Sequence, residues 1–399
     1  MKLSKKRINI IVYITTIVFS ILYIFIGNKI CKTSIYEDSV HSLQTESGVV
    51  TKILDVQHNE YSLGGENDNS TVTEKTIFFE SYVKEIDNYV IATQSNDSMH
   101  PVNPKDVEEG DQVLLSNVSD VGGSEEAEWV FAEYKRSTTL IYLGVVFLIL
   151  VIIFGRKKGV NTIISLGFTC LAIFAVFVPS ILSGFNVYLT SIITCLFIIF
   201  MTLILINGVG KKTFCSIVGC LGGISVTALL TSIMDRLLNL TGAVDEDAVF
   251  LLLLNESNPI DLRSIIFGAI IIGALGATMD ISLSIASSLQ EVSDNMANRS
   301  FQALVKSGFN IGRDMIGTMA NTLILAYIGS SLTIVLLLVA NAGSLLNLFN
   351  REMIVVEIMQ ALVGSLGILF TIPITSILSA YVYSMKSKKE KIITEETVD

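Results

Sequence analysis

Eight separate runs of apolar residues limit what this chain can fold into. They lie at residues 8–26, 140–155, 161–182, 187–206, 214–235, 264–285, 315–340 and 357–384. A helix that crosses the roughly 30 Å core of a bilayer needs about 20 such residues. A water-soluble domain rarely carries so many runs, and 51% of all residues are hydrophobic. We therefore predict a polytopic α-helical membrane protein with about eight transmembrane helices and the lipid bilayer as its first partner.

The first apolar run follows a basic start, with Lys2, Lys5, Lys6 and Arg7 ahead of it. This arrangement resembles a signal peptide, but no small-residue cleavage site follows the run. Residues 1–27 are therefore predicted to be a basic tail and an uncleaved signal-anchor helix.

Residues 28–139 have a different composition and pattern. They contain 21 acidic and 8 basic side chains, and this negative charge makes nucleic acid an unsuitable partner. Short segments rich in β-branched and aromatic residues, separated by turns, predict β-strands. These segments lie at 49–54, 76–80, 89–93, 112–115 and 129–132. We predict a small β-barrel, OB-like or SH3-like, between the first two membrane helices.

The distribution of lysine and arginine predicts the orientation of the chain. With the amino terminus inside, the inner segments hold 4, 3, 2, 3 and 4 basic residues, whereas the three outer membrane loops hold 0, 2 and 1. Basic residues favour cytoplasmic loops. Both termini are thus predicted to be cytoplasmic and residues 28–139 extracytoplasmic. Residues 140–385 then form a seven-helix membrane domain, and 386–399 a charged cytoplasmic tail. We expect residues 300–306 to form an amphipathic piece at the inner membrane surface.

A stripe of small and acidic residues marks the run at 264–285. Residues three or four apart share one helix face. The stripe consists of Ala269, Gly273, Gly276, Asp280, Ser284, Ser287 and Glu291. A carboxylate at this depth is costly in lipid, so this face is expected to meet other helices or water.

Two later runs carry similar stripes, and an earlier run carries glycines that allow close helix approach. The polar candidates for a pathway are Asp280, Glu291, Asn310, Arg313, Asp314, Asn321, Glu357 and Thr371. The candidates for helix packing are Gly219, Gly223, Gly273, Gly276, Gly364 and Gly367. Arg313 is the expected partner of Asp280. The three polar seams are expected to face each other.

These residues predict no enzyme. The membrane runs contain no histidine, so neither a metal pair nor an activated nucleophile is predicted there. The five cysteines show no zinc-ligand spacing. No metal, other cofactor or catalytic residue is expected.

Several motifs resemble one family. They are Gly-Ala-Thr-Met-Asp-Ile at 276–281, the run at 310–327, Glu357-Ile358 and the segments 363–367 and 373–375. Together they are similar to the YibE/F family of bacterial multi-pass membrane proteins, over roughly residues 140–384. The resemblance implies a bacterial cytoplasmic membrane and supports eight helices. It implies no substrate and no mechanism.

Two functions remain open. The first is a transporter or permease of a small solute or ion, with Asp280 in a polar helix seam. The alternative is a non-transporting membrane scaffold or accessory subunit, whose external domain binds an envelope partner. In the second case the seams only pack helices. A homo-oligomer and an envelope protein both remain open as partners.

Overall fold

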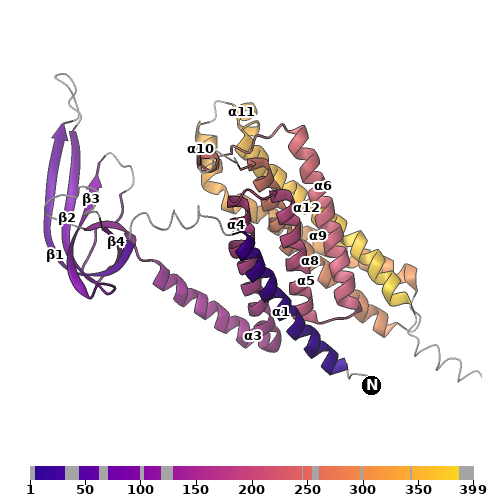
Figure 1. The fold of residues 1–399 in the computed structure, drawn as a ribbon. Helices are drawn as coiled ribbons and strands as arrows, with labels where there is room; N and C mark the ends of the chain where they lie inside the picture. The colour runs from indigo at the N-terminus through magenta and orange to yellow at the C-terminus, as the bar shows by residue number, and fades with distance from the viewer. Residues whose placement is uncertain are drawn as a thin grey trace, which may run out of the picture. The chain divides into compact units, whose positions relative to one another are not determined.

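The computed structural model describes residues 5–31, 45–62, 71–98, 103–117, 129–244, 246–253, 260–296, 300–341 and 344–385. The chain forms two compact units (Figure 1). One comprises Met1–Thr33 with Gly155–Asp399, and the other comprises Ser34–Phe154.

The second unit contains a closed five-stranded barrel. Its strands are β1 (Thr45–Ser62), β2 (Thr71–Val83), β3 (Asn88–Asp97), β4 (Gln112–Asn117) and β5 (Trp129–Tyr134). The order around the barrel is β1-β2-β3-β5-β4, with β1 also paired to β4. Only β3 and β5 run parallel among the pairs described. This topology is that of an OB-type barrel, so the predicted barrel and its five strands are confirmed.

Alternation of apolar and polar residues explains the barrel. Along β3, buried and exposed side chains alternate, as a strand with one face toward a core requires. Phe79, Ala92, Val113 and Leu115 point inward and are completely buried. The opposite face is exposed and carries polar and acidic residues together with apolar ones such as Tyr89 and Ile91. The strands are longer than the sequence pattern indicated because β1 and β2 extend as a hairpin to Ser62 and Thr71.

The first unit is a helical bundle. Its helices are α1 (Lys5–Cys31), the second part of α3 (Ser137–Ala172), α4 (Val178–Leu182), α5 (Val187–Asn207), α6 (Lys211–Leu237), α7 (Glu246–Leu253), α8 (Leu262–Asn295), α9 (Phe301–Ser330), α10 (Leu332–Asn341), α11 (Leu345–Phe349) and α12 (Glu352–Ser384). A π-helical turn, η2 (Ile173–Phe177), joins α3 to α4. Within the described ranges, six helical segments are long and apolar enough to cross a membrane. They are Asn9–Cys31, Ser137–Leu182, α5, α6, α8 and α12.

The predicted runs correspond to helices of the structure with three differences. The run at 315–340 is divided at Ser331 between α9 and α10, and neither of these helices is among the six membrane-length segments. Arg156 has non-helical backbone angles (φ 48°, ψ −128°) and divides α3 into two helices, which match the runs at 140–155 and 161–182. The stretch at 300–306, which was expected at the inner membrane surface, is the first part of α9, which begins at Phe301 and continues to Ser330. Leu304, Gly308 and Gly312 form one buried face along it, so packing holds the whole stretch in one helix.

Helices α6, α8, α9 and α12 form the main body of the bundle, and α12 packs against each of the other three (Figure 1). Helix α5 packs against α6 and α8, and α1 packs against α5. The largest completely buried side chains of α8 are Ile270, Ile271, Ile281, Ile285 and Leu289. They point into this body, which leaves the opposite side of α8 free of that packing.

Candidate functional site

The seam between α6 and α12 is tightly packed. A Cβ atom on Gly219 would overlap Thr375, and one on Gly223 would overlap Thr371. On the other side, a Cβ atom on Gly367 would overlap Thr227. Glycine is therefore needed at these three positions for the backbones to approach.

The hydroxyl groups of Thr371 and Thr375 in this seam are satisfied within their own helix. Thr371 donates to the carbonyl oxygen of Gly367 at 2.8 Å, and Thr375 donates to that of Thr371 at 2.7 Å. Both threonines are completely buried. Gly364 lies nearby on α12, facing Leu323 of α9 and Ala274 of α8. This seam, which includes the pathway candidate Thr371, has the chemistry of helix packing rather than of a solute route.

The stripe on α8 lies in a different environment. Gly273, Gly276, Asp280 and Glu291 are exposed, and a Cβ atom on Gly276 would have no neighbour within 4 Å. Asp280 forms neither a hydrogen bond nor an ion pair with any residue that the structure describes. The expected ion pair with Arg313 is therefore wrong for a single copy of the chain. We call these exposed residues the α8 polar face.

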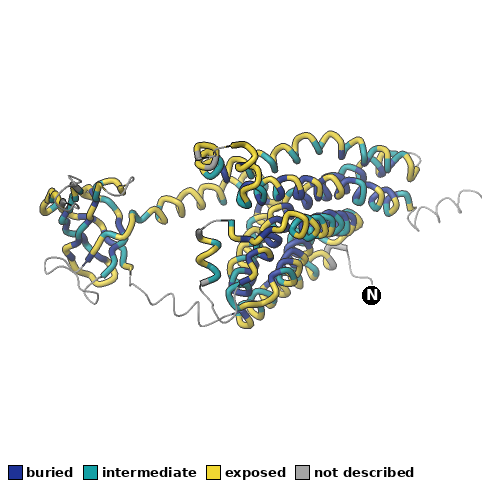
Figure 2. The backbone as a smooth tube through the Cα atoms, turned by 90° about the horizontal axis from the view of Figure 1, so that it is seen from above, coloured by how far each residue is buried: buried dark blue, intermediate teal, exposed yellow. Residues whose placement is uncertain are grey.

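Helix α9 presents a similar face. Asn310, Arg313, Asp314, Gly317 and Asn321 are all exposed, while the opposite side of the helix packs against α12 and α8. Figure 2 shows helices of the bundle that are buried on their inner sides and exposed on their outer sides. We call these five residues the α9 polar face. The expectation that the seams of α8, α9 and α12 face one another is wrong for Asp280 and the α9 polar face, which are exposed. At Gly273, however, a Cβ atom would overlap Tyr327 of α9 and lie 3.7 Å from Nε2 of Gln360 on α12.

The two polar faces lie at a similar level along the bundle. Gly308 of α9 lies beside Leu289 of α8, and Tyr327 lies over Gly273. The helices therefore run antiparallel, and Asp280 lies level with the middle of α9. Glu357 lies near the Tyr327 end, where it lines a mainly apolar cavity of about 410 Å³.

A cluster of charged residues that the sequence did not predict surrounds a set of polar cavities. Tyr188 at the start of α5, Asp235 and Arg236 at the end of α6, and Asp261 and Arg263 at the start of α8 line a cavity of about 580 Å³. We call it the Asp235 pocket. The sequence contained one signal, because a charged pair ends one apolar run and another precedes the next. Only the fold brings the two pairs together.

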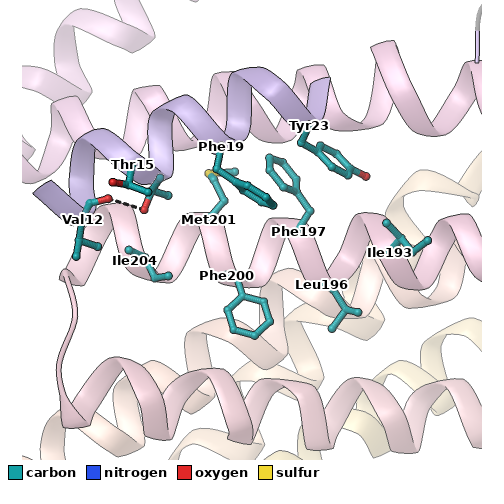
Figure 3. Close-up of a pocket in the computed structure, with 11 residues that line it drawn as sticks. Val12, Thr15, Phe19, Tyr23, Ile193, Leu196, Phe197, Phe200, Met201 and Ile204 are labelled. Carbon is teal, nitrogen blue, oxygen red and sulfur yellow. Dashed lines mark hydrogen bonds between the residues drawn. The ribbon is translucent and has the colours of Figure 1, made fainter. Parts of the chain in front are cut away.

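A large apolar cavity lies between α1 and α5 (Figure 3). Its volume is about 600 Å³, and it is lined by Phe19 and Tyr23 of α1 and by Phe197 and Phe200 of α5. Tyr23 stacks on Phe197 with ring centroids 4.1 Å apart. The lining offers little for polar recognition, and it suits a hydrocarbon chain.

The fold and these faces define a class of protein, a helical membrane protein with a small barrel after its first helix. Residues 143–385 match the family model described as YibE/F-like protein, which is more than half of the chain. The chain therefore belongs to the YibE/F-like family, and the resemblance in its motifs is confirmed. No curated protein and no solved structure matches it.

Proposed function

We propose that this protein is a permease that moves a small solute or ion along the polar faces of α8 and α9. The observation that supports the proposal is the exposure of Asp280, Arg313 and Asp314 on helices of the bundle body. A charge at the centre of a bilayer costs about 2.5–3.5 kcal/mol on insertion scales. Lipid tails cannot hydrogen-bond these groups, so water, solute or another protein surface must cover them.

The extent of the α9 polar face agrees with a route. Asn310 and Asn321 are separated by eleven residues, or roughly 16 Å of helix at 1.5 Å per residue. That length is about half of a hydrocarbon core of roughly 30 Å. Asp280 lies level with this stretch, so its carboxylate is at the same depth along the bundle as the side-chain amides of α9. A discontinuous set of polar groups near the midplane is typical of transporters.

We propose that a second copy of the chain closes this route. Arg313 and Asp314 are adjacent and exposed, so two copies related by a twofold axis can form reciprocal ion pairs. We further propose eight membrane crossings in a bacterial cytoplasmic membrane, with α9 and both parts of α3 among them. Both termini are then cytoplasmic, and the barrel is extracytoplasmic, in agreement with the distribution of basic residues.

Flux through purified protein in proteoliposomes tests the proposal. Wild-type protein is screened with a panel of ions and small solutes, and Asp280→Asn and Asp280→Ala are then compared for the solute that moves. We expect both variants to lose at least about tenfold in rate, because removal of an intramembrane charge abolishes its coupling role. Glu109→Gln, which removes an exposed carboxylate from the barrel unit, is the control. Wild-type flux in both Asp280 variants at equal folded yield would contradict the proposal.

A second candidate function is a scaffold that binds an envelope protein through the barrel. It is favoured by exposed apolar side chains on the outer face of the barrel. Val49, Tyr89 and Ile91 are 41%, 59% and 48% exposed, and Tyr82 and Tyr89 have ring centroids 5.3 Å apart. Aromatic residues with apolar neighbours are enriched at protein interfaces.

Photo-crosslinking in cells distinguishes this candidate. A photoreactive residue at position 89 should capture one reproducible envelope protein, whereas the same residue at position 109 should not. Deletion of residues 32–136 that leaves every cellular phenotype unchanged would rule out the scaffold function.

A further inference from the structure

Two smaller cavities adjoin the Asp235 pocket, at the end of the bundle where α6 ends and α8 begins. The volumes of the three cavities are about 580, 280 and 220 Å³, and Tyr188 lines all three. Asp235, Arg236 and Arg263 line the two larger cavities, and Asp261 links the largest to the smallest. The three cavities therefore share lining residues, and charged side chains at the end of α6 and the start of α8 border them.

The charged side chains that line these cavities form no ion pair with one another within the described part of the chain, although Asp261 caps α8 by accepting a hydrogen bond from the backbone amide of Arg263 at 3.2 Å. Oδ1 of Asp235 is buried and has no hydrogen-bond partner. A buried polar atom without a partner is costly, so Oδ1 of the half-buried Asp235, next to a cavity, is a place where water or a ligand can bind.

A neighbouring carboxylate shows the contrast. Glu352 at the start of α12 accepts hydrogen bonds from the backbone amides of Thr241 and Gly242 at 2.7 and 2.6 Å. It also accepts one from the Thr241 hydroxyl at 2.8 Å. Glu352 thus ties the segment after α6 to α12 and has a structural role. Asp235 has no such contacts, so its carboxylate has no structural partner to explain it.

The inner wall of the pocket is apolar. The 280 Å³ cavity extends from the charged residues to Ile266, Phe267 and Met359. The ring of Tyr188 lies against that of Phe267, with centroids 4.8 Å apart. The space therefore accepts a short apolar group beside a charged one.

We propose that the Asp235 pocket binds a small zwitterion, a molecule with an ammonium group and a carboxylate or phosphate group. Guanidinium groups match carboxylate and phosphate in geometry, so Arg236 and Arg263 hold the anionic group. The ammonium group donates to Asp235. A simple anion is repelled by Asp235 and Asp261, and a simple cation by the two arginines. The pocket offers two positive and two negative side chains. A ligand that carries both charges can therefore pair its anionic group with the arginines and its ammonium group with the carboxylates.

Such a group has two sources, a free metabolite and the zwitterionic headgroup of a lipid. The inference does not depend on transport, because binding is measured at equilibrium. Failure of the flux experiment therefore leaves it standing, and failure of the binding experiment leaves the flux proposal standing.

Isothermal titration of the full-length protein in detergent tests the site with leucine and phosphoethanolamine as probes. We expect at least one zwitterion to bind at least about tenfold more tightly than acetate, phosphate or ethylamine, since each of these carries only one of the two charges. Asp235→Asn and Arg263→Gln should each weaken that binding by at least about tenfold. Arg351→Gln removes an exposed arginine outside the pocket and should bind as the wild type does.

The outcomes of this titration are distinct. If Asp235→Asn does not fold, Arg236→Gln replaces it, because Arg236 is exposed at the last turn of α6. Zwitterion binding no tighter than that of single charges, or unchanged binding in the pocket variants, would overturn the site.

Nanodiscs separate the two sources. Discs of phosphatidylethanolamine should compete with phosphoethanolamine, relative to discs of phosphatidylglycerol, if the lipid headgroup enters the pocket. If free phosphoethanolamine binds equally well in both kinds of disc, the lipid headgroup does not compete with it, and the site binds a soluble zwitterion. Either result supports the zwitterion site, and absence of binding in both discs and in detergent refutes it.

Discussion

The α6/α12 seam and the polar faces of α8 and α9 have the same sequence signature and opposite surroundings. Small and polar residues recur three or four positions apart in both. Between α6 and α12 the glycines are in contact with the facing threonines, and the hydroxyl groups bond to their own backbone. On α8 and α9 the residues are exposed, and Gly276 and Gly317 face open space.

This difference separates residues that stabilise the helical bundle from residues that are available for function. A dry seam of glycine and threonine is sufficiently explained by close packing of two membrane helices. Charged residues on the outside of a helical bundle reduce stability in lipid and find no compensation within one chain. Natural sequences depart from such rules mainly at functional sites. The exposed faces, and not the buried seam, are therefore where solute or a second copy is expected.

The largest expected effect comes from filling the buried seam. Gly223→Leu should lower the free energy of unfolding by about 3 kcal/mol or more, at the upper end of overpacking costs. The reason is that a Cβ atom at this position would overlap Thr371 and lie 3.1 Å from the carbonyl oxygen of Gly367, which is backbone and cannot move aside. Gly276→Leu is the matched control, with a cost below about 1 kcal/mol. Unfolding in mixed micelles titrated with SDS measures the stability of both variants. Equal losses of unfolding free energy would mean that the buried seam and the α8 polar face do not differ in packing.

The second pair of variants tests which side of α9 packs within one chain. A Cβ atom on Gly308 would lie 2.7 Å from Cβ of Ser376 and 3.0 Å from Cδ1 of Leu289. Gly308→Leu should therefore cost about 2 kcal/mol, since part of this contact is a flexible side chain. Gly317→Leu should leave the unfolding free energy nearly unchanged and lower the fraction of cross-linked dimer instead. Loss of monomer stability in Gly317→Leu would place the polar face inside the bundle.

Thiol labelling sharpens the comparison by asking where water reaches. Asn321→Cys should react with a charged maleimide roughly tenfold or more faster than Thr371→Cys, because the reagent needs a hydrated path to the thiol. Cys170, which is exposed, is first replaced by serine, and the four other native cysteines are buried. The rates are measured in intact proteoliposomes. Similar slow rates at both positions would mean that lipid or protein, rather than water, covers the α9 face.

Much of the architecture could be predicted from the sequence because it follows from periodicity. The alternation in 89–93 identified β3, and the apolar runs identified α5, α6 and α12. The break at Ser331 was missed, although Gly329, Ser330 and Ser331 interrupt the apolar run there, because isolated small residues are also common inside membrane helices. The amphipathic stretch at 301–309 was assigned to the membrane surface because its polar side resembles a water-facing side.

The candidate residues were harder to interpret than the fold. Helical spacing places Asp280 and Thr371 on defined faces, but it does not tell which face a neighbouring helix covers. That depends on the order in which α6, α8, α9 and α12 pack. The Asp235 pocket shows the same limit, since Tyr188 and Asp261 are separated by more than 70 positions in the sequence. No local pattern indicates that they border one cavity.

The smallest expected effect is also the most direct test of a purely structural seam. Thr227 donates its hydroxyl hydrogen to the carbonyl oxygen of Gly223 at 3.1 Å, within its own helix. Thr227→Val keeps the shape beside Gly367 and removes only this bond. We expect a loss of about 0.6 kcal/mol or less in unfolding free energy and no change in flux, because about 0.6 kcal/mol is the average for bonds between membrane helices and this bond joins no second helix. Loss of flux at unchanged stability would make this hydroxyl part of a solute route. The buried seam and the exposed faces would then belong to one pathway, and exposure would no longer separate packing from function.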